Sequence, residues 1–521
     1  MNAWKRYFQL GLLVFLIGGM VSCSDNKDNP IPPKEEEKEE PQETQKPEVT
    51  ADTEMNATID EFLEDYYLWN DDYKKMSRDL TIPYVDAYEN FLRSSLMKMT
   101  TNDLDKKKNA DGSYKLYSYV DRTEKKSGGK SVASGVNHGI EKEDKVSSYG
   151  FSNLVSVSFA DSKQLGFVVQ SVYPASSASS FGVNRGTFIL KIDGEEITED
   201  NLVTHYLELL QPTKRNVTLT VTDGGEEAKE VYLQTMEIDP TPILMHTILE
   251  EGAHKIGYLV YESFDAAYDN ELLEVLSDFK SKGITDMVLD LRYNAGGHVI
   301  TAKMLAASIN GSSCKNQIFQ YYRYNAGRMK DIDGTKRRTG NEYDSAAGYF
   351  YEKYLFDNYY GVNLGSYALN LPRLYVLTTD NSNSASELLI NSLKGLDKQV
   401  VVIGENTGGK NVGMEVKEFD KGNYSYELAP ITFQYYNAKK VTIPADGLKV
   451  DHAVADWNPE VGFVDFGKKE EPLLAKAIEL ITGASPKTTA KARAVAPLGV
   501  KKHTDRLPER KGYHPEGAII F

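Results

Sequence analysis

The spacing of hydrophobic and polar positions divides the chain into segments of different character. The stretches "MNATIDEFLEDYYLWNDDYKKM" and "YVDAYENFLRSSLMKM" place apolar and aromatic residues at a helical spacing, with acidic residues early in each. Residues 106–147 are rich in lysine, glycine and serine and predict mostly connecting structure around the strand-like "YKLYSYV". We therefore predict a small helical N-terminal domain, with its connection, over residues 51–147.

Residues 148–240 change to short strand patterns separated by turn signals. "GFVVQSVY", "FILKIDGEEI", "NVTLTVTDG" and "KEVYLQTM" predict strands, and "NLVTHYLELLQ" predicts one helix between the second and the third. This arrangement predicts a small β-rich domain.

Strands and helices alternate in residues 241–482. "KIGYLVYESF" predicts a strand, "NELLEVLSDFKSKG" a helix closed by glycine, and "DMVLDLR" a buried strand; "RLYVLTTD", "SASELLINSLKG" and "QVVVIG" repeat the alternation. This order predicts an α/β domain with a largely parallel sheet. Residues 483–521 are basic and poorly patterned and predict a flexible tail.

The first 50 residues have the composition of an export signal and a spacer. Lys5 and Arg6 precede an apolar run of signal-peptide length, and small residues precede Cys23. This order resembles a bacterial lipoprotein signal (residues 1–23), in which Cys23 would carry lipid; an uncleaved anchor helix is the alternative. Residues 24–50 are acidic and proline-containing and predict a linker. Both alternatives predict an exported protein tethered to a bacterial membrane, facing the periplasm or the cell surface.

Composition narrows the possible functions. The 521 residues are 40% hydrophobic, enough for several cores, and the formal net charge of −16 argues against a general nucleic-acid binder. The two cysteines are Cys23 and Cys314. If Cys23 carries lipid, no internal disulfide is possible. Cys314 has no accompanying motif, and we predict that it is structural.

The stretch "VVVIGENTGGKNVG" at residues 400–413 is similar to a phosphate-binding loop, because Gly404, Gly409 and Lys410 have the required spacing. That loop also needs Ser or Thr after the lysine and a following helix. Here Asn411 follows Lys410, and the next residues alternate as strands do. A nucleotide-binding protein is therefore a remote alternative, which predicts ATP binding that depends on Lys410.

A strand, a polar turn and a helix follow one another in "LYVLTTDNSNSASELLINSLKG". Ser384 lies at the start of the predicted helix, where the helix dipole favours an alkoxide and free amides can donate to an oxyanion. Ser384 and Glu387 also fit a capping box, which by itself is the better explanation of this stretch.

A double glycine, Gly296 and Gly297, follows the buried strand in "DMVLDLRYNAGGHV". Such a turn exposes backbone amides at the carboxyl edge of a sheet, where sites in α/β folds gather. A simple tight turn is the alternative.

Together, "DLRYNAGG", "NSNSASE" and "GENTGGKNVG" resemble, in this order, the motifs of the carboxy-terminal processing (tail-specific) serine peptidases. The resemblance covers about residues 149–465 and implies a multidomain protein with a ClpP/crotonase-like α/β catalytic domain. It places the nucleophile at Ser384, the general base at Lys410, and the oxyanion amides at Gly296 or Gly297 and at Ala385. The activity implied is a serine-type endopeptidase with a Ser–Lys dyad, and no metal or organic cofactor is implied.

The chemistry agrees with this placement, because a lysine acts as a base only when it is neutral, which requires a lowered pKa in an apolar, water-poor site. Four residues depart from the usual family motifs: Ala295, Asn383, Asn411 and Met414. The departures leave open a catalytically silent peptide-binding lipoprotein with the same fold.

His298 directly follows the double glycine and suggests a Ser–His pair as an alternative. A histidine at this place more often lines or covers a site. We favour the dyad of Ser384 and Lys410.

The stretch "LGFVVQSVYPASSASSFGVNRGTFILKIDGEEI" resembles a PDZ domain, a module that adds a peptide strand to its sheet edge. Tyr149, Gly150 and Phe151 are the candidate peptide-binding loop, although the usual motif is only half present and Thr187 replaces a common aspartate. A β-domain that only positions or gates the protease is the alternative. The family implies polypeptide substrates with accessible C-terminal or unfolded segments. The sequence does not indicate the oligomeric state.

Overall fold

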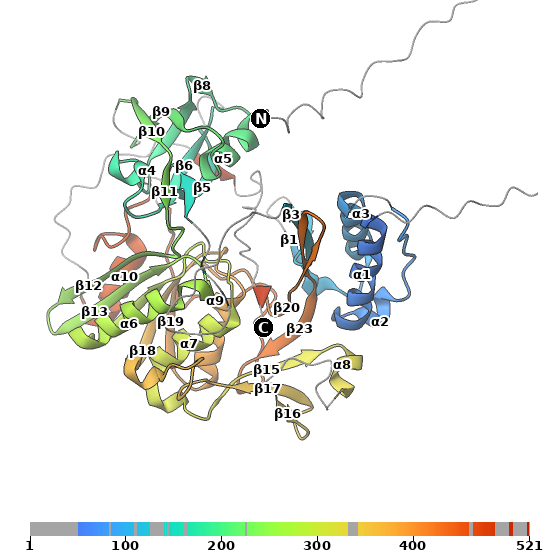
Figure 1. The fold of residues 1–521 in the computed structure, drawn as a ribbon. Coiled ribbons are helices and arrows are strands. Elements are labelled where there is room, and N and C mark those ends of the chain that lie inside the picture. The colour runs from blue at the N-terminus through green and yellow to red at the C-terminus, as the bar shows by residue number, and fades with distance from the viewer. Residues whose placement is uncertain are drawn as a thin grey trace, which may run out of the picture. The chain divides into compact units, whose positions relative to one another are not determined.

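The computed structural model describes residues 51–82, 85–108, 112–124, 140, 142, 145–159, 164–223, 227–331, 342–457, 462–484, 500–503 and 518–519. They belong to one compact unit that starts at Val49 (Figure 1). The predicted signal, linker and lipidated Cys23 lie outside the described residues. None of the described helices has both the length and the hydropathy needed to cross a membrane.

The N-terminal segment forms three helices, α1 (Ala51–Tyr66), α2 (Asn70–Tyr73) and α3 (Val85–Lys98), followed by the short helix η1 (Asp103–Asp105). A hairpin of β1 (Lys106–Lys108) and β2 (Tyr114–Leu116) comes next. The buried core of this part includes Ile59, Leu63 and Tyr67, which recur on one face of α1 and just beyond it. The helical spacing in the sequence therefore reflects a packed face.

The segment predicted as mostly connection contributes a strand to a distant part of the chain. β3 (Tyr119–Glu124) pairs antiparallel with β22 (Tyr424–Ala429), which also pairs with β21 (Lys417–Lys421). The Tyr119 hydroxyl donates to Glu427 across this pair. Sequence periodicity could not reveal this pairing because the partner lies about 300 residues away.

The β-rich domain has the strand order β10-β9-β7-β6-β5. Its strands are β5 (Phe151–Phe159), β6 (Leu165–Val172), β7 (Phe188–Ile192), β8 (Glu195–Glu196), β9 (Asn216–Thr222) and β10 (Lys229–Gln234), with helices α4 (Ser177–Ser180) and α5 (Leu202–Leu210). The four predicted strand regions and the predicted helix are confirmed. In β9, Val217, Leu219 and Val221 are buried while their neighbours are more exposed, as the alternating sequence predicts.

The α/β part has a central sheet in the order β12-β13-β14-β18-β19-β24. The strands are β12 (Ile243–Glu251), β13 (His254–Tyr261), β14 (Asp286–Asp290), β18 (Arg373–Thr378), β19 (Gln399–Gly404) and β24 (His452–Ala453). All neighbours are parallel except β12 and β13, so the predicted largely parallel sheet is confirmed.

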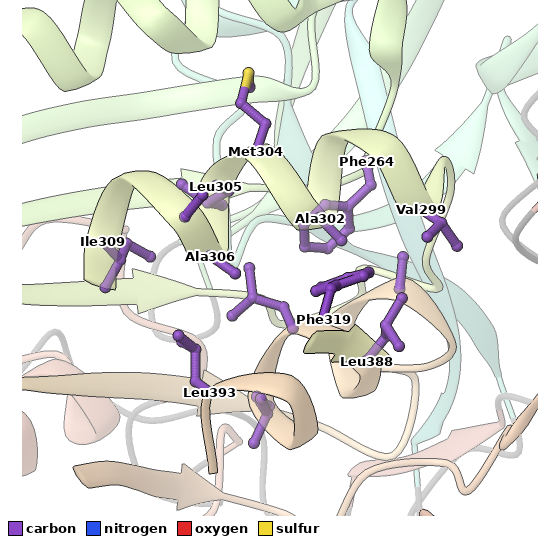
Figure 2. Close-up of a cluster of buried hydrophobic side chains, with 14 of the residues drawn as sticks. Phe264, Val299, Ala302, Met304, Leu305, Ala306, Ile309, Phe319, Leu388 and Leu393 are labelled. Atoms are coloured by element: carbon purple, nitrogen blue, oxygen red, sulfur yellow. The ribbon is translucent and has the colours of Figure 1, made fainter. Parts of the chain in front are cut away.

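Helices cover both faces of this sheet, which explains why every residue of the central strand β14 is buried. Leu289 of β14 faces the core that contains residues of α6 (Asp269–Lys282), α7 (Val299–Asn310) and α9 (Ala385–Gly395). The preceding residue, Val288, points to the opposite face of the sheet and packs against α10 (Pro472–Thr482). Every residue of α7 is buried, and this helix packs against α9 (Figure 2). The helices α7 and α9 are therefore held in place by close packing in the core.

A second sheet has the order β16-β17-β15-β23-β20-β26. Its strands are β15 (Ile318–Tyr324), β16 (Glu342–Asp344), β17 (Tyr349–Lys353), β20 (Val412–Glu415), β23 (Ile431–Tyr436) and β26 (Ala518–Ile519). The remaining elements are β4 (Val146–Ser148), β11 (Met236–Ile238), η2 (Ala266–Tyr268), η3 (Gly311–Cys314), α8 (Ala326–Lys330) and η4 (Leu364–Tyr367).

The predicted flexible tail at residues 483–521 needs a correction. Residues Val500–His503 form β25, which pairs with β5 at the edge of the β-rich sheet, and β26 pairs with β20. An edge strand offers unpaired backbone groups to an extended segment regardless of its side-chain pattern. A poorly patterned sequence therefore did not predict these two strands.

Candidate functional site

The double-glycine turn after β14 is built by a buried asparagine. The Asn294 side chain accepts a hydrogen bond from the Gly296 N–H (2.9 Å) and donates to the carbonyl of Tyr261 (2.8 Å). Gly296 and Gly297 have φ angles of 121° and 134°, which favour glycine. The turn is thereby fixed in a conformation that other residues rarely adopt.

Ser384 is the N-cap residue of α9 and has a strained backbone, with φ 53° and ψ −110°. Positive φ in a residue other than glycine costs free energy and gathers at functional sites. A Cβ added at Gly296 would lie 2.7 Å from the Cβ of Ser384 and 3.1 Å from the backbone N of Ala385. Only glycine therefore allows this close approach, which brings Gly296, Ser384 and Ala385 together as the sequence motifs predict.

The turn that carries Ser384 is bound directly to the double-glycine turn. The Asn383 N–H and the Ser386 hydroxyl both donate to the carbonyl of Asn294, at 3.0 and 2.9 Å. The Ser382 hydroxyl donates to the carbonyl of Leu291 at 2.7 Å. These hydrogen bonds hold the turn at residue 384 directly against the turn at residue 294.

The hydrogen bonds within the double-glycine turn indicate which of the three predicted N–H groups is already engaged and which two could donate to an oxyanion. The Gly296 N–H already donates to Asn294, as described above. Gly297 and Ala385 contribute the other predicted N–H groups, and Ala385 is in the first helical turn, where amides lack an intrahelical acceptor. Of the three predicted residues, Gly297 and Ala385 are therefore the better donors, while Gly296 provides space for Ser384.

Lys410 is buried, with 1% of its surface exposed, and Ser384 is 6% exposed. The Lys410 N–H donates to Oε2 of Glu387 (2.9 Å), and the Lys410 carbonyl accepts from the hydroxyl of Tyr435 (2.6 Å). Tyr435 also approaches the carbonyl of Ser384 at 3.3 Å. Glu387 and Tyr435 thus join the backbones at the two predicted dyad residues.

Glu387 connects the Ser384 turn to the Lys410 loop. Its Oε2 accepts from the N–H groups of Ser384 (3.0 Å) and Lys410, while its Oε1 accepts from Gly409 N–H (2.8 Å) and the Thr407 hydroxyl. Burial raises the pKa of Glu387 to about 7, although these hydrogen bonds oppose the rise. The bond from the Ser384 N–H belongs to the capping interaction that the sequence suggests, so one glutamate serves the cap and the lysine loop.

We predict that replacing Glu387 by glutamine changes both stability and activity. The folded state holds the Glu387 proton more tightly than the unfolded state, so this stabilisation is complete below pH 4.5 and is lost as the pH rises through about 7. A pKa shift of this size changes the free energy of unfolding by roughly 3 kcal/mol over this pH range. The glutamine variant has no titrating group at this position, so it should lack this pH dependence. Urea unfolding of both proteins from pH 4.5 to 8 measures the difference.

Each carboxylate oxygen of Glu387 accepts two hydrogen bonds. In the glutamine variant an NH₂ group replaces one of these oxygens and faces two donors with which it cannot form hydrogen bonds as an acceptor. We expect hydrolysis to fall by about 10- to 100-fold through misplacement of Lys410. An identical pH dependence of unfolding in parent and variant would exclude the proposed titration of Glu387.

The structure adds two residues that the sequence did not indicate. Nζ of Lys410 lies 4.7 Å from the ring centroid of Tyr117, a cation–π distance. Burial raises the pKa of Asp105 to about 6, although hydrogen bonds and the nearby charge of Lys410 oppose the rise. Its carboxylate accepts from the hydroxyls of Tyr67 (2.7 Å) and Ser118 (2.8 Å). These residues come from the N-terminal part, where no motif points to a site.

His298 is the N-cap residue of α7 but its side chain makes no capping hydrogen bond; its Nδ1 lies 3.2 Å from the backbone N of Ala266 and from the carbonyl oxygen of Phe264. These contacts engage the imidazole with the backbone beside the double-glycine turn. Cys314 is buried, and burial raises its pKa to about 12, which disfavours a nucleophilic thiolate. Among the residues described, no cluster of His, Cys, Asp or Glu has the arrangement of a metal site.

The predicted peptide-binding residues lie at the start of β5. The side chains of Tyr149 and Phe151 are buried in the core of the β-rich domain. The Gly150 N–H donates to the hydroxyl of Ser148 (3.0 Å), and a Cβ at Gly150 would lie 2.2 Å from Ser176. These residues shape the loop, and peptide binding by them stays a prediction.

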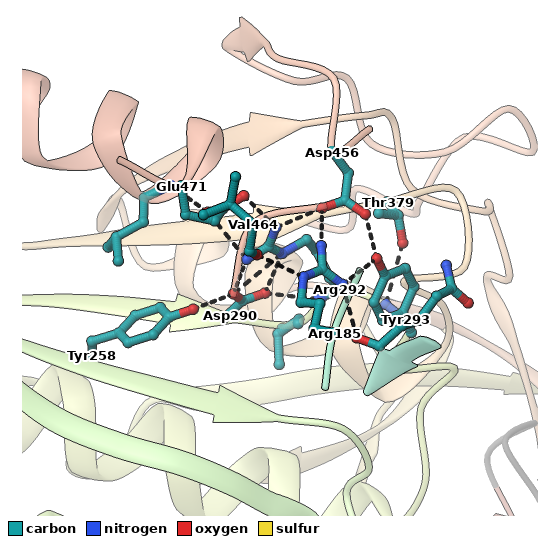
Figure 3. A network of polar contacts seen from close by, with 12 residues as sticks. Arg185, Tyr258, Asp290, Arg292, Tyr293, Thr379, Asp456, Val464 and Glu471 are labelled. Carbon is teal, nitrogen blue, oxygen red and sulfur yellow. Dashed lines mark hydrogen bonds and ion pairs between the residues drawn. The ribbon is translucent and has the colours of Figure 1, made fainter. Parts of the chain in front are cut away.

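A buried ionic network surrounds Arg292, a few residues before the double glycine in the sequence (Figure 3). Arg292 donates to Asp290 (2.6 Å), Asp456 (2.6 Å) and Glu471 (2.7 Å), and the side chains of all four residues are at most 2% exposed. The guanidinium of Arg185 also donates to Asp456 at 2.6 Å.

Arg185 connects this network to the β-rich domain. It lies between β6 and β7 and donates to the hydroxyl of Tyr293 (2.8 Å) and to the carbonyl of Gln170 (2.9 Å). Tyr293 directly precedes Asn294, so the contact reaches the residue that shapes the double-glycine turn.

Comparison with known proteins agrees with this geometry. Residues 255–454 match the sequence profile of peptidase family S41. A carboxyl-terminal-processing protease of Synechocystis sp. is 23% identical over 313 residues, which make up 59% of this chain and 63% of that protein. A carboxy-terminal-processing protease of Bartonella bacilliformis is 24% identical over 287 residues, or 54% of this chain and 57% of that protein. The chain therefore spans less than two thirds of the length of these relatives.

The crystal structure of a candidate S41 protease from Bacteroides fragilis has a similar fold, with a TM-score of 0.59 and 22% identity. The match covers 82% of this chain and 98% of that chain. The segment that matches peptidase family S41 contains all three motifs, and carboxyl-terminal-processing proteases are homologues at low identity.

Proposed function

We propose that the protein is a serine-type endopeptidase that uses Ser384 and Lys410 as a catalytic dyad. The observation that carries the proposal is the strained Ser384 turn, which is pressed against Gly296 and linked through Glu387 to the buried Lys410 loop. A capping serine alone needs neither the strain nor the connection to a buried lysine.

Ser384 Oγ attacks the carbonyl carbon of the scissile peptide bond, and Nζ of Lys410 takes the hydroxyl proton. The N–H groups of Gly297 and Ala385 donate to the oxyanion. Lys410 returns the proton to the leaving amine as the C–N bond breaks, which leaves an acyl-enzyme on Ser384. A water molecule then attacks the ester carbonyl while Lys410 accepts one of its protons. Lys410 returns this proton to Ser384 Oγ as the acyl C–O bond breaks, which releases the carboxylic acid and restores the serine hydroxyl.

The N-terminal part supports this chemistry. The ring face of Tyr117 and the carboxylate of Asp105 stabilise the ammonium that forms when Lys410 accepts a proton, so the surroundings of Lys410 are less apolar than the sequence predicts. Both residues therefore act on the base without touching the peptide bond.

The substrates are polypeptides with accessible C-terminal or unfolded segments, which the edge of the β-rich, PDZ-like domain binds as an added strand. The domain's contact with the site runs through Arg185 and Tyr293. A lipid on Cys23 anchors the exported protein to a bacterial membrane, facing the periplasm or the cell surface.

The test is digestion of a loosely folded protein, such as a casein, by residues 49–521. We predict that the parent cuts it, while replacing Lys410 by alanine lowers the rate by at least about 10³-fold because Ser384 loses its base. Mass spectrometry of the fragments measures the rate and identifies the cleavage sites.

Lys394→Ala is the control, because this lysine lies in the last turn of α9, beyond the site. Full activity of the Lys410 variant would contradict the proposal. If the parent leaves the substrate intact but still binds a peptide, a catalytically silent binder is the better description.

A further inference from the structure

Two sheet edges are occupied by C-terminal residues of the chain itself: one in the β-rich domain that we propose binds substrate, and one on the strand that follows Lys410. β25 (Val500–His503) pairs antiparallel with β5, with Val500 opposite Phe159 and His503 opposite Ser156. Apart from β25, β5 is the last strand of its sheet. The tail thus completes an edge that would otherwise be free.

β25 runs antiparallel to β5, in the direction expected of a peptide whose C-terminus points toward the predicted peptide-binding loop. β25 runs from the end of β5 toward its start, where Tyr149 and Gly150 form the predicted peptide-binding loop. A peptide added to this edge makes main-chain hydrogen bonds, so its affinity depends only weakly on side-chain identity. The basic residues Lys501 and Lys502 are therefore compatible with this position.

The second contact lies beside the proposed base. β26 pairs parallel with β20, with Ala518 opposite Met414 and Ile519 opposite Glu415. β20 begins two residues after Lys410 and is, apart from β26, the last strand of its sheet. The same tail therefore covers the edge of the strand that leads away from Lys410.

We propose that β25 and β26 form an internal strand ligand that competes with substrate for both edges. The effect on hydrolysis rests on the proposed peptidase function, whereas the competition for β5 does not. An occupant on the same chain has an effective concentration of about 1 mM, so an internal strand that binds the edge with a Kd of about 100 μM would weaken the binding of any competing peptide roughly tenfold. Short strands of this kind remain displaceable by a better ligand.

The test compares two double variants of residues 49–521, each also carrying Ser384→Ala. Lys501→Pro with Lys502→Pro removes both N–H groups, one of which points toward β5 because neighbouring residues in a strand alternate. Lys501→Ala with Lys502→Ala removes the same two charges and keeps both N–H groups. The probe is a fluorescent peptide with the sequence LGVKKHTD, residues 498–505.

We expect the proline variant to bind the probe about tenfold more tightly than the alanine variant, as measured by fluorescence anisotropy. Equal affinities, or no binding by either variant, would overturn the proposal. The double proline and double alanine variants that keep Ser384 are then assayed for hydrolysis. Tighter peptide binding by the proline variant without any hydrolysis would contradict the peptidase function but would still support the internal strand ligand.

Discussion

Replacing Ser384 by alanine is expected to lower peptide-bond hydrolysis by at least about 10⁴-fold, because alanine lacks the hydroxyl that forms the acyl-enzyme. The residual rate comes from the oxyanion donors and from substrate binding. The variant should remain folded, because the hydrogen bond from the residue 384 N–H to Glu387 is kept. Initial rates of fragment release, measured by mass spectrometry, give the ratio.

The matched control is Ser392→Ala. Ser392 is buried in the same helix, and its hydroxyl donates to the carbonyl of Leu389, one turn back, at 3.0 Å. This variant should keep activity within about twofold and lose roughly 1 kcal/mol of stability. Equal losses of activity in both variants would assign the effect to damage in α9 rather than to a missing nucleophile.

Replacing Arg292 by leucine is expected to lower the free energy of unfolding by about 3–5 kcal/mol, because it leaves buried carboxylates without their main partner. Asp290, Asp456 and Glu471 all face this guanidinium, and burial raises the pKa of Glu471 although the charge of Arg292 opposes the rise. The loss should shrink as the pH falls, because protonation removes the unpaired negative charges. Urea unfolding at several pH values measures both effects.

Arg373→Leu is the control for this prediction. Arg373 pairs with Asp286 at 3.0 Å, but its side chain is 28% exposed, so its loss should cost less than about 1 kcal/mol. Similar losses for Arg292 and Arg373 would show that burial of the network adds nothing.

The sequence predicts the chemistry of the site because its main parts are local motifs. The strand and double glycine, the Ser384 turn and the Lys410 loop each have a recognisable pattern, and the parallel sheet brings their ends together. The capping explanation for Ser384 and Glu387 was also informative, since the structure uses Glu387 for the cap and for the lysine loop.

Other parts depend on contacts between distant segments, which periodicity does not reveal. Tyr117 and Asp105 reach Lys410 because β3 pairs with β22, a strand that lies about 300 residues later in the chain. The pairing of β25 with β5 relies on backbone groups, so its sequence has no distinctive pattern. The choice of Gly297 over Gly296 as donor also required the hydrogen bond from Gly296 to Asn294.

The most direct measurement of the central claim is covalent labelling of residues 49–521 by a fluorophosphonate, followed by mass spectrometry of the modified peptide. The reagent phosphonylates an activated serine and releases fluoride. We predict one label per chain, on Ser384, and at least tenfold slower labelling in Lys410→Ala. Labelling of another serine, or an unchanged rate without Lys410, would contradict the Ser–Lys dyad.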